Sequence, residues 1–155
     1  MPECVKPIKE SEKELPLDYY LKSGWQVILN KYNQIAAQYG ITQAMGYVLI
    51  NIQKEGTPVT QIASLMGVKS TSLSRILNHL EKLGLIYRMV NDLDKRSVKV
   101  FLTPTGIEKK RIARRVVLDL NAYLDQHMSK SEKKVVTSVL ERINSIIPDY
   151  NPENP

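Results

Sequence analysis

The sequence predicts a mainly α-helical protein with one small β-hairpin. Between residues 57 and 84, two short segments with helical apolar spacing lie on either side of Gly67, the pattern of two helices joined by a turn. β-branched and aromatic residues then gather at 85–88 and 98–102 around a polar tip, the pattern of a hairpin. This order predicts a winged helix-turn-helix, with the helical regions 17–56 and 104–147 around it forming a dimerisation region.

Length and composition favour one cytoplasmic domain. A chain of 155 residues is long enough to build a core of its own. We expect tails at 1–16 and 148–155 and a winged helix-turn-helix lobe at 57–103. No apolar run approaches 18 residues, and the polar start lacks the apolar segment of a signal peptide. The single Cys4 excludes an internal disulfide and fits a reducing compartment.

Before the hairpin, apolar spacing and breaking residues set the expected helix limits. The first helix is expected from Leu17 to about Tyr39, before Gly40. The second is expected at 42–54, since Gly56 and Pro58 oppose its continuation. Thr60 is the expected cap of the third helix, whose core side is Ile62, Ala63, Leu65 and Met66.

The fourth helix is expected from Lys69 or Ser70 to Gly84, with Leu73, Ile76, Leu77, Leu80 and Leu83 in the core. A short extra strand is expected near Val59. After the hairpin, Thr103 is the expected cap of a long helix with Pro104 in its first turn. A last helix is expected after Ser131, capped with help from Lys134 and stopped by Pro148.

The net charge of +6 comes from one part of the chain. Residues 57–118 hold 12 basic and 4 acidic side chains, whereas residues 1–56 are neutral and 119–155 sum to −2. A basic segment between neutral and acidic flanks is typical of a protein that binds a polyanion.

One face of the fourth helix has no acidic residue. It holds Thr71, Ser74, Arg75, Asn78 and Lys82, with His79 at its margin. Hydroxyls, an amide and cations suit base edges and phosphates. Periodicity alone favours the solvated face of an amphipathic helix. The adjoining hairpin and the charge distribution reverse this preference and favour DNA contact.

Three pieces of the sequence resemble the MarR family of bacterial winged-helix transcription regulators. The first runs from Thr60 to Gly67 and the second from Ser72 to Ile86. The third is Asp94-Lys95-Arg96 followed by Leu102-Thr103 and Gly106, which is similar to the D-x-R and L-T-x-x-G elements of the family's wing. The resemblance covers about 17–147 and is strongest over 57–106.

The resemblance implies a homodimer that binds double-stranded DNA. The first helix and the last two helices of each subunit interlock, and each recognition helix enters a major groove while Arg96 reaches the minor groove. Many relatives are repressors that small anionic or phenolic effectors, or cysteine oxidation, release from DNA. The region that corresponds to the peroxide-sensing cysteine, 18–22, has no cysteine, and Cys4 lies upstream, so a redox role is not favoured.

The expected DNA contacts divide by chemistry. Arg75 and Asn78 are expected to read bases, and Thr71 to contact DNA beside them. Ser70, Ser74 and Lys82 are expected to hold phosphates. Lys69 stands where relatives often have Ser or Asp, so it is expected to contact phosphate while Ser70 caps the helix. In the wing, Asp94 is expected to orient Arg96, with Lys95 beside them, although all three also fit a polar hairpin tip.

Several alternatives stay open. The basic run 109–115 fits a solvated helix face, a flank for the DNA backbone or a site for an anionic effector. The aromatic residues Tyr19, Tyr20, Trp25, Tyr32, Tyr39 and Tyr47 fit a core or a dimer interface better than a ligand site. The sequence offers no catalytic constellation, metal-ligand spacing or cofactor motif, so an enzyme is not expected. The competing function is a winged-helix adaptor that contacts proteins.

Overall fold

The computed structural model describes residues 15–90 and 97–153, and the chain divides into two compact units at Ala44 and Met45. The first unit contains α1 (Leu17–Ala37) and the turn after it. Gly40 sits in this turn at φ +71°, and the Ile41 N–H donates back to the Ala36 carbonyl at 3.3 Å. This is the way in which a glycine after a helix satisfies free terminal carbonyls.

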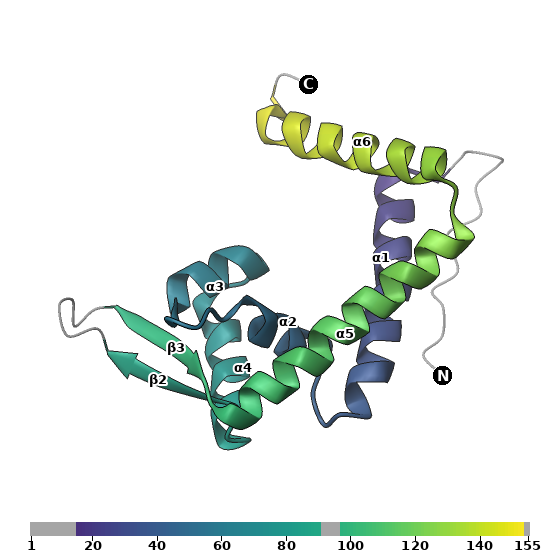
Figure 1. Cartoon of the computed structure of the whole chain (residues 1–155). Helices are drawn as coiled ribbons and strands as arrows, with labels where there is room; N and C mark the ends of the chain where they lie inside the picture. The colour runs from purple at the N-terminus through teal and green to yellow at the C-terminus, as the bar shows by residue number, and fades with distance from the viewer. Residues whose placement is uncertain (1–14, 91–96, 154–155) are drawn as a thin grey trace. The chain divides into compact units, whose positions relative to one another are not determined.

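The second unit holds the predicted winged helix-turn-helix, which confirms the fold class (Figure 1). Helix α2 begins two residues before the unit boundary. From α2 onward, the elements follow one another in the expected order. They are α2 (Gln43–Asn51), β1 (Thr57–Pro58), α3 (Val59–Met66), α4 (Ser70–Lys82), β2 (Ile86–Val90), β3 (Val98–Leu102), α5 (Pro104–His127), α6 (Lys130–Ile146) and a 3₁₀ turn (Ile147–Asp149).

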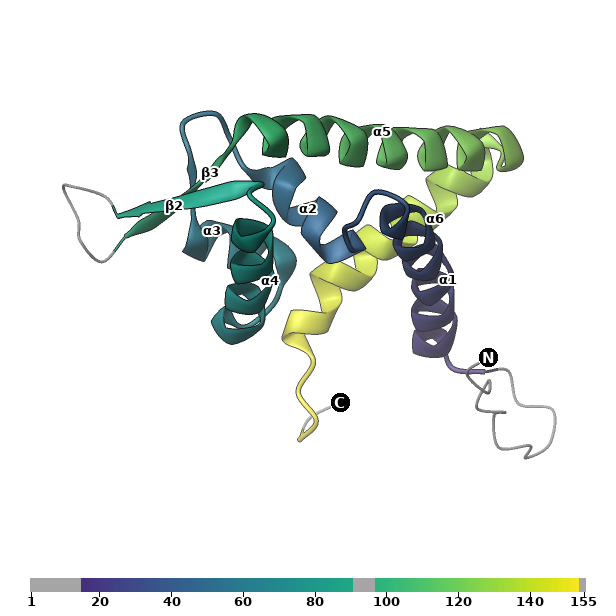
Figure 2. The same ribbon diagram turned by 90° about the horizontal axis from the view of Figure 1, so that it is seen from below.

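The sheet has the strand order β1-β3-β2 and is antiparallel throughout. The hairpin pairs Ile86 with Leu102 at its base and Val90 with Val98 at its far end. It projects away from the helices of its own unit in both views (Figures 1 and 2). Its base is held on both sides, since α4 contacts β2 and both α3 and α5 contact β3.

The core of the second unit lies between α2, α3, α4 and the base of the sheet. Its fully buried side chains come from all of these elements: Val48, Leu49, Ile52, Ile62, Leu73, Leu77, Leu80, Ile86 and Val100. Burying one such side chain stabilises the fold by about 1.5–3 kcal/mol. Together they fix which face of α4 turns inward, and therefore which face is left for a partner.

Thr103 joins the start of α5 to the end of α4. Its hydroxyl accepts from the Gly106 N–H at 3.0 Å, which confirms the predicted cap, and donates to the Gly84 carbonyl at 2.6 Å. Its N–H donates to the Leu85 carbonyl at 3.1 Å. Gly106 is buried against that same carbonyl, because an added Cβ would lie 1.8 Å from the Leu85 oxygen.

Three predicted caps are wrong. Helix α3 begins at Val59, directly after extended Pro58, so Thr60 lies inside its first turn and caps nothing. Ser70 is the first residue of α4 and Lys69 is its N-cap, without a side-chain hydrogen bond. Helix α6 is capped by Ser129 and not by Ser131 and Lys134. The Ser129 hydroxyl accepts from the Glu132 N–H, and the Glu132 carboxylate accepts from the Ser129 N–H.

The other differences concern boundaries and burial. Helix α2 ends at Asn51, three residues before the predicted end, because the chain turns to bring Thr57 into the sheet. The extra strand is therefore Thr57–Pro58 and not Val59. Leu65 and Leu83 were expected in the core, but 49% and 44% of their surfaces are exposed, since both stand at helix ends beyond the packed layer.

Candidate nucleic-acid interface

Helix α4 presents one polar face to solvent. Leu73, Leu77 and Leu80 anchor its opposite face, each with 1% or less of its surface exposed. The outward side chains predicted to contact DNA on this helix and at its cap are all exposed: Lys69, Ser70, Thr71, Ser74, Arg75, Asn78 and Lys82. The structure therefore brings together every predicted site residue outside the wing tip.

Within this face the side chains differ in what they can still bind. Across residues 15–90 and 97–153, the side chains of Thr71, Arg75 and Lys82 make no hydrogen bond or ion pair. Ser74 is different, because its hydroxyl donates to the Ser70 carbonyl at 2.8 Å. To donate to a phosphate, Ser74 has to give up that bond, which makes it a weaker candidate than the sequence indicates.

The start of α4 suits an anion. No side chain caps it, and its first turn contains no acidic residue. The free N–H groups and the positive end of a helix dipole bind phosphate readily. Lys69, which stands at the cap in extended conformation, adds a full positive charge at this point.

Arg88 on β2 is part of the same surface, and the sequence reasoning missed it. Its Nη2 atom lies 2.5 Å from the Glu81 carboxylate and 2.7 Å from Oδ1 of Asn78, while its Nε lies 3.4 Å from the other Glu81 oxygen. A signal was present in the sequence. Glu81 and Arg88 are opposite charges on either side of a short turn at Gly84.

The hydrogen bond from Arg88 holds the pKa of Glu81 below its ordinary value, partly opposed by desolvation. A lowered carboxyl pKa stabilises the fold fully above the ordinary pKa, and this contribution is lost as the pH falls through the lowered value. About one third of each side chain stays exposed, at 32% for Arg88 and 37% for Glu81, so water weakens the pair.

We therefore expect Glu81→Gln to lower the free energy of unfolding by at most about 1 kcal/mol at neutral pH. The difference from the wild type should begin to shrink as the pH falls below the ordinary pKa of a glutamate, about 4, and should vanish only once the pH has passed through the lowered pKa of Glu81. Urea denaturation of both proteins between pH 7 and pH 3 measures it. A difference that stays constant over this range would contradict an ionic contribution.

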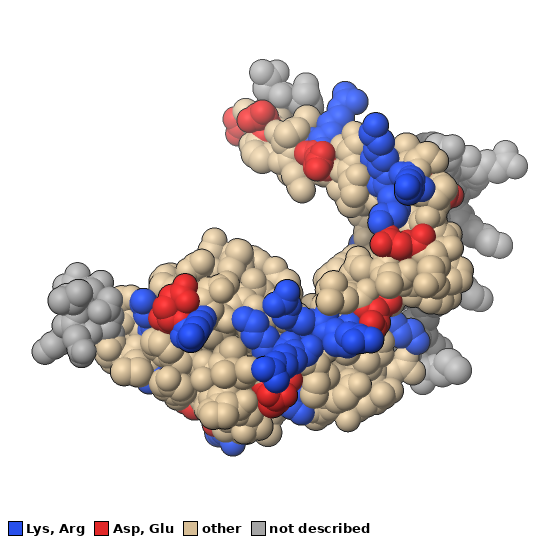
Figure 3. Space-filling model, viewed as in Figure 1, with Lys and Arg blue, Asp and Glu red and all other residues tan. Residues whose placement is uncertain are grey.

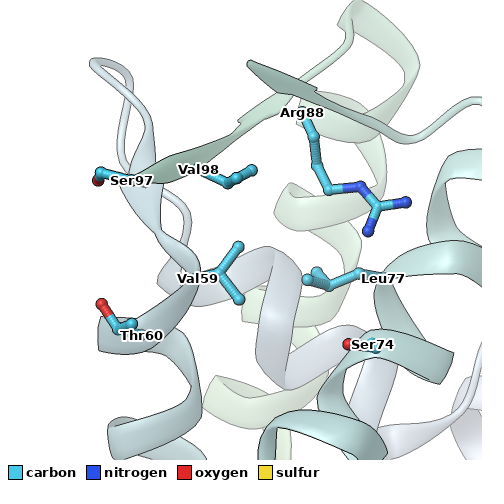
Figure 4. A pocket seen from close by; sticks show the side chains of 7 residues that line it. All are labelled: Val59, Thr60, Ser74, Leu77, Arg88, Ser97 and Val98. Atoms are coloured by element: carbon cyan, nitrogen blue, oxygen red, sulfur yellow. The ribbon is translucent and has the colours of Figure 1, made fainter. Parts of the chain in front are cut away.

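A hollow of about 290 Å³ opens between α3, α4 and the hairpin. Its walls are Val59 and Thr60 on α3, Ser74 and Leu77 on α4, Arg88 on β2, and Ser97 and Val98 at the start of β3. Figure 4 shows the Arg88 side chain reaching from its strand toward the helix that carries Leu77 and Ser74. The hollow is mostly apolar, with one cation at its wall.

The predicted wing residues Asp94, Lys95 and Arg96 lie outside the described residues. Strand β2 ends before them at Val90, and strand β3 begins after them at Val98. Near the hairpin base the Tyr87 and Phe101 rings stack at 5.3 Å between centroids. Gly56 lies under the Phe101 ring, where a Cβ would come within 2.4 Å of it, and its φ of +80° also favours glycine.

The basic run on α5 forms a second charged surface, and Lys and Arg side chains gather over the first half of this helix (Figure 3). Several of these cations are already engaged. Arg111 pairs with Glu108 at 2.6 Å, and Arg115 with Asp119 at 2.9 Å. Lys110 donates to the Ile52 carbonyl at 2.6 Å, and burial lowers the pKa of Lys110. These partners favour the reading of a solvated helix face over a dedicated anion site.

Two features of the described part of the chain bear on other classes of protein. No described helix has the length and apolar character that crossing a membrane requires. Across residues 15–90 and 97–153, no group of three or more His, Cys, Asp or Glu side chains is placed to hold a metal ion.

Comparison with known proteins agrees with this geometry. A sequence profile described as the MarR family matches residues 46–98. The chain is 24% identical to the HTH-type transcriptional regulator SarZ of Staphylococcus haemolyticus (strain JCSC1435) over 144 residues, or 92% of this chain and 97% of that protein. It is 31% identical to the HTH-type transcriptional repressor MdtR of Bacillus subtilis (strain 168) over 87 residues, 56% of each chain. Among solved structures, the S. aureus MepR-DNA complex is similar, with a TM-score of 0.79 and 24% identity over 86% of this chain and all of that one.

Proposed function

Because this chain belongs to the MarR family, we propose that it is a DNA-binding transcriptional regulator that acts as a homodimer on a palindromic operator. The observation that carries the proposal is the exposed, acid-free face of α4 beside an uncapped, lysine-bearing helix start. The repressor MdtR and the MepR-DNA complex among the similar proteins support both DNA binding and repression.

Within this proposal, Arg75 is the main base-reading residue. It is exposed near the middle of the α4 face and makes no hydrogen bond or ion pair with another of the described residues. Two parallel N–H groups of a guanidinium match O6 and N7 of guanine. We expect Arg75→Ala to lower operator affinity by about 5- to 150-fold, equivalent to ~1–3 kcal/mol, while affinity for unrelated DNA falls much less.

Quantitative gel shifts on selected operator and on scrambled duplex measure both affinities. Lys134→Ala is the matched control, because it removes one exposed cation from α6, on the side opposite the apolar stripe of that helix. Operator binding by Arg75→Ala at the wild-type affinity would refute the assignment. Absence of any DNA binding by the wild type at low salt would favour the adaptor function instead.

We propose that α6 supplies part of the dimer interface. No residue of α6 is buried, and its apolar side chains recur at helical spacing on one stripe. Between 39% and 62% of the surface of each is exposed at Val135, Val136, Val139, Leu140 and Ile146, and 62% is exposed at Ile147 in the 3₁₀ turn that follows. A contiguous apolar stripe of this kind marks an association surface, and a symmetric dimer covers it on both copies at once.

We expect light scattering to give twice the chain mass of 17.7 kDa. Leu140→Glu should shift the protein toward monomer, because two carboxylates would be buried in the apolar contact. Lys134→Glu is the matched control, since it introduces the same side chain on the opposite side of α6 and should leave the dimer intact. A wild-type monomer at micromolar concentration would contradict the proposal.

A response to a small anionic or phenolic effector is the finer part of the proposal. The hollow beside α4 supports a phenolic effector more than an anionic one, because its walls are mostly apolar and the Arg88 guanidinium at its wall already pairs with Glu81. A ligand seated there would contact Ser74 and Leu77 of α4, the helix proposed to contact DNA. Adding small aromatic carboxylates to the gel shift tests this part, and DNA release by none of them counts against it.

A further inference from the structure

The inference concerns the contact between Arg88 and Asn78, and it rests on the proposed DNA-binding function. Asn78 stands within about 20° of Thr71 around the helix, near the centre of the exposed α4 face. Arg88 reaches this residue from the neighbouring strand β2. It therefore touches a residue of the α4 surface without lying on α4 itself.

The chemistry of the contact fixes the orientation of the Asn78 amide. A guanidinium has hydrogen-bond donors and no acceptor. The atom of Asn78 that lies 2.7 Å from Arg88 Nη2 must therefore be the carbonyl oxygen Oδ1. The two donor hydrogens of Nδ2 then point away from Arg88 and remain available to a base.

Glu81 keeps Arg88 in this position. Its carboxylate engages both Nε and Nη2 of the guanidinium, at 3.4 and 2.5 Å. The second hydrogen on Nη2 is left for Asn78, so the three side chains form one connected cluster. Because Glu81 and Asn78 contact the planar guanidinium of Arg88 at different edges, they hold it in a fixed orientation.

Occupation of Oδ1 changes what Asn78 can read. A free asparagine pairs bidentately with adenine, accepting from N6 and donating to N7. Here a donor at N6 would have to approach an oxygen that already accepts from a cation, beside the positive charge of Arg88. Guanine presents acceptors at both O6 and N7, and thymine presents O4, so these edges suit the free Nδ2 donors.

We propose that Arg88 is a specificity-determining positioning residue, which occupies Oδ1 of Asn78 and thereby directs the base pair opposite Asn78 toward guanine or thymine and away from adenine. Its side chain acts through Asn78 and needs no contact of its own with a base.

The test is base preference measured with the full-length protein. Operators are selected from randomised duplexes with the wild type, and relative affinities for all four bases are then measured at each half-site position. Asn78→Ala identifies the position that Asn78 reads, because the preference flattens there. At this position we expect the wild type to favour guanine or thymine over adenine by roughly fivefold or more. Arg88→Met should shift the preference by a similar factor toward adenine, and leave the other positions unchanged.

Arg111→Met is the matched control, because it also removes an arginine from a surface pair with a glutamate, on α5. It should not change the base preference at any position. The same preference in Arg88→Met as in the wild type overturns the inference, even if affinity falls uniformly, since a uniform loss reports only a structural role. A wild type that binds no DNA at low salt overturns the proposed function itself, which is a separate result.

Discussion

Gly106→Ala is expected to destabilise the protein by at least about 3 kcal/mol. The added Cβ would lie 1.8 Å from the Leu85 oxygen, 2.9 Å from its carbonyl carbon and 3.3 Å from Leu102 Cδ2. The nearest of these atoms belong to the backbone, so no side-chain rotation relieves the clash. The start of α5 has to move away from the end of α4, which breaks the hydrogen bonds that Thr103 makes there.

Helix propensity alone predicts the opposite change in stability for this substitution. Alanine within a helix is favoured over glycine by about 0.8–1 kcal/mol, so an unobstructed site gains stability. Gly24 in α1 is such a site, since an added Cβ meets nothing within 4 Å. Gly24→Ala is therefore the control and should be neutral or stabilising. Urea denaturation at one fixed protein concentration compares the variants, and a Gly106→Ala protein as stable as the wild type would contradict the described contact.

The largest expected effect is the salt dependence of DNA binding. A dimer that neutralises about 6–10 phosphates should lose ~10³–10⁵ in operator affinity between 50 and 200 mM salt, because each contact releases counterions. The uncapped start of α4, Lys69 and Lys82 supply candidates for these contacts in the described structure. Arg96 is a further candidate in the wing.

Removal of one phosphate contact should reduce the slope of log affinity against log salt by about one, and therefore by about two in a dimer. We expect this reduction for Lys82→Ala and Arg96→Ala, each measured by fluorescence anisotropy across the salt range. Lys134→Ala on α6 should keep the wild-type slope. If neither variant changes the slope while the control behaves as expected, neither side chain contacts the DNA backbone.

The sequence predicted the fold well wherever hydrophobic spacing and breaking residues act locally. The leucines at 73, 77 and 80 determine which face of α4 is buried, and the Thr103 cap follows from its place before Pro104. The helix starts at Thr60 and Ser131 were wrong for a local reason. At α6 the nearby hydroxyls of Ser129 and Ser131 are both possible caps, and the backbone conformation selects Ser129. At α3 the helix starts directly after extended Pro58, so no hydroxyl caps it.

The part of the site that sequence reasoning missed depends on contacts between elements. The sequence places Arg88 only in a strand, because spacing along β2 does not show that its side chain crosses to Glu81 and Asn78. The burial of Gly106 against Leu85 is equally invisible, since it requires the exact approach of α5 to the end of α4. Ser74 looked like a free hydroxyl until its bond to the Ser70 carbonyl was resolved.

The close packing of Gly106 against Leu85 fixes the first turn of α5, so the rest of this helix can move only by tilting about that turn. The helix has 24 residues and is therefore about 36 Å long, and its first turn is held against the end of α4 by Thr103 and Gly106. A tilt of about 5° about the first turn displaces the far end of α5 by roughly 3 Å over that length. Conversely, a small displacement of the far end of α5 rotates the helix about its first turn. Because Gly106 packs directly against the Leu85 carbonyl, this rotation acts on the end of α4.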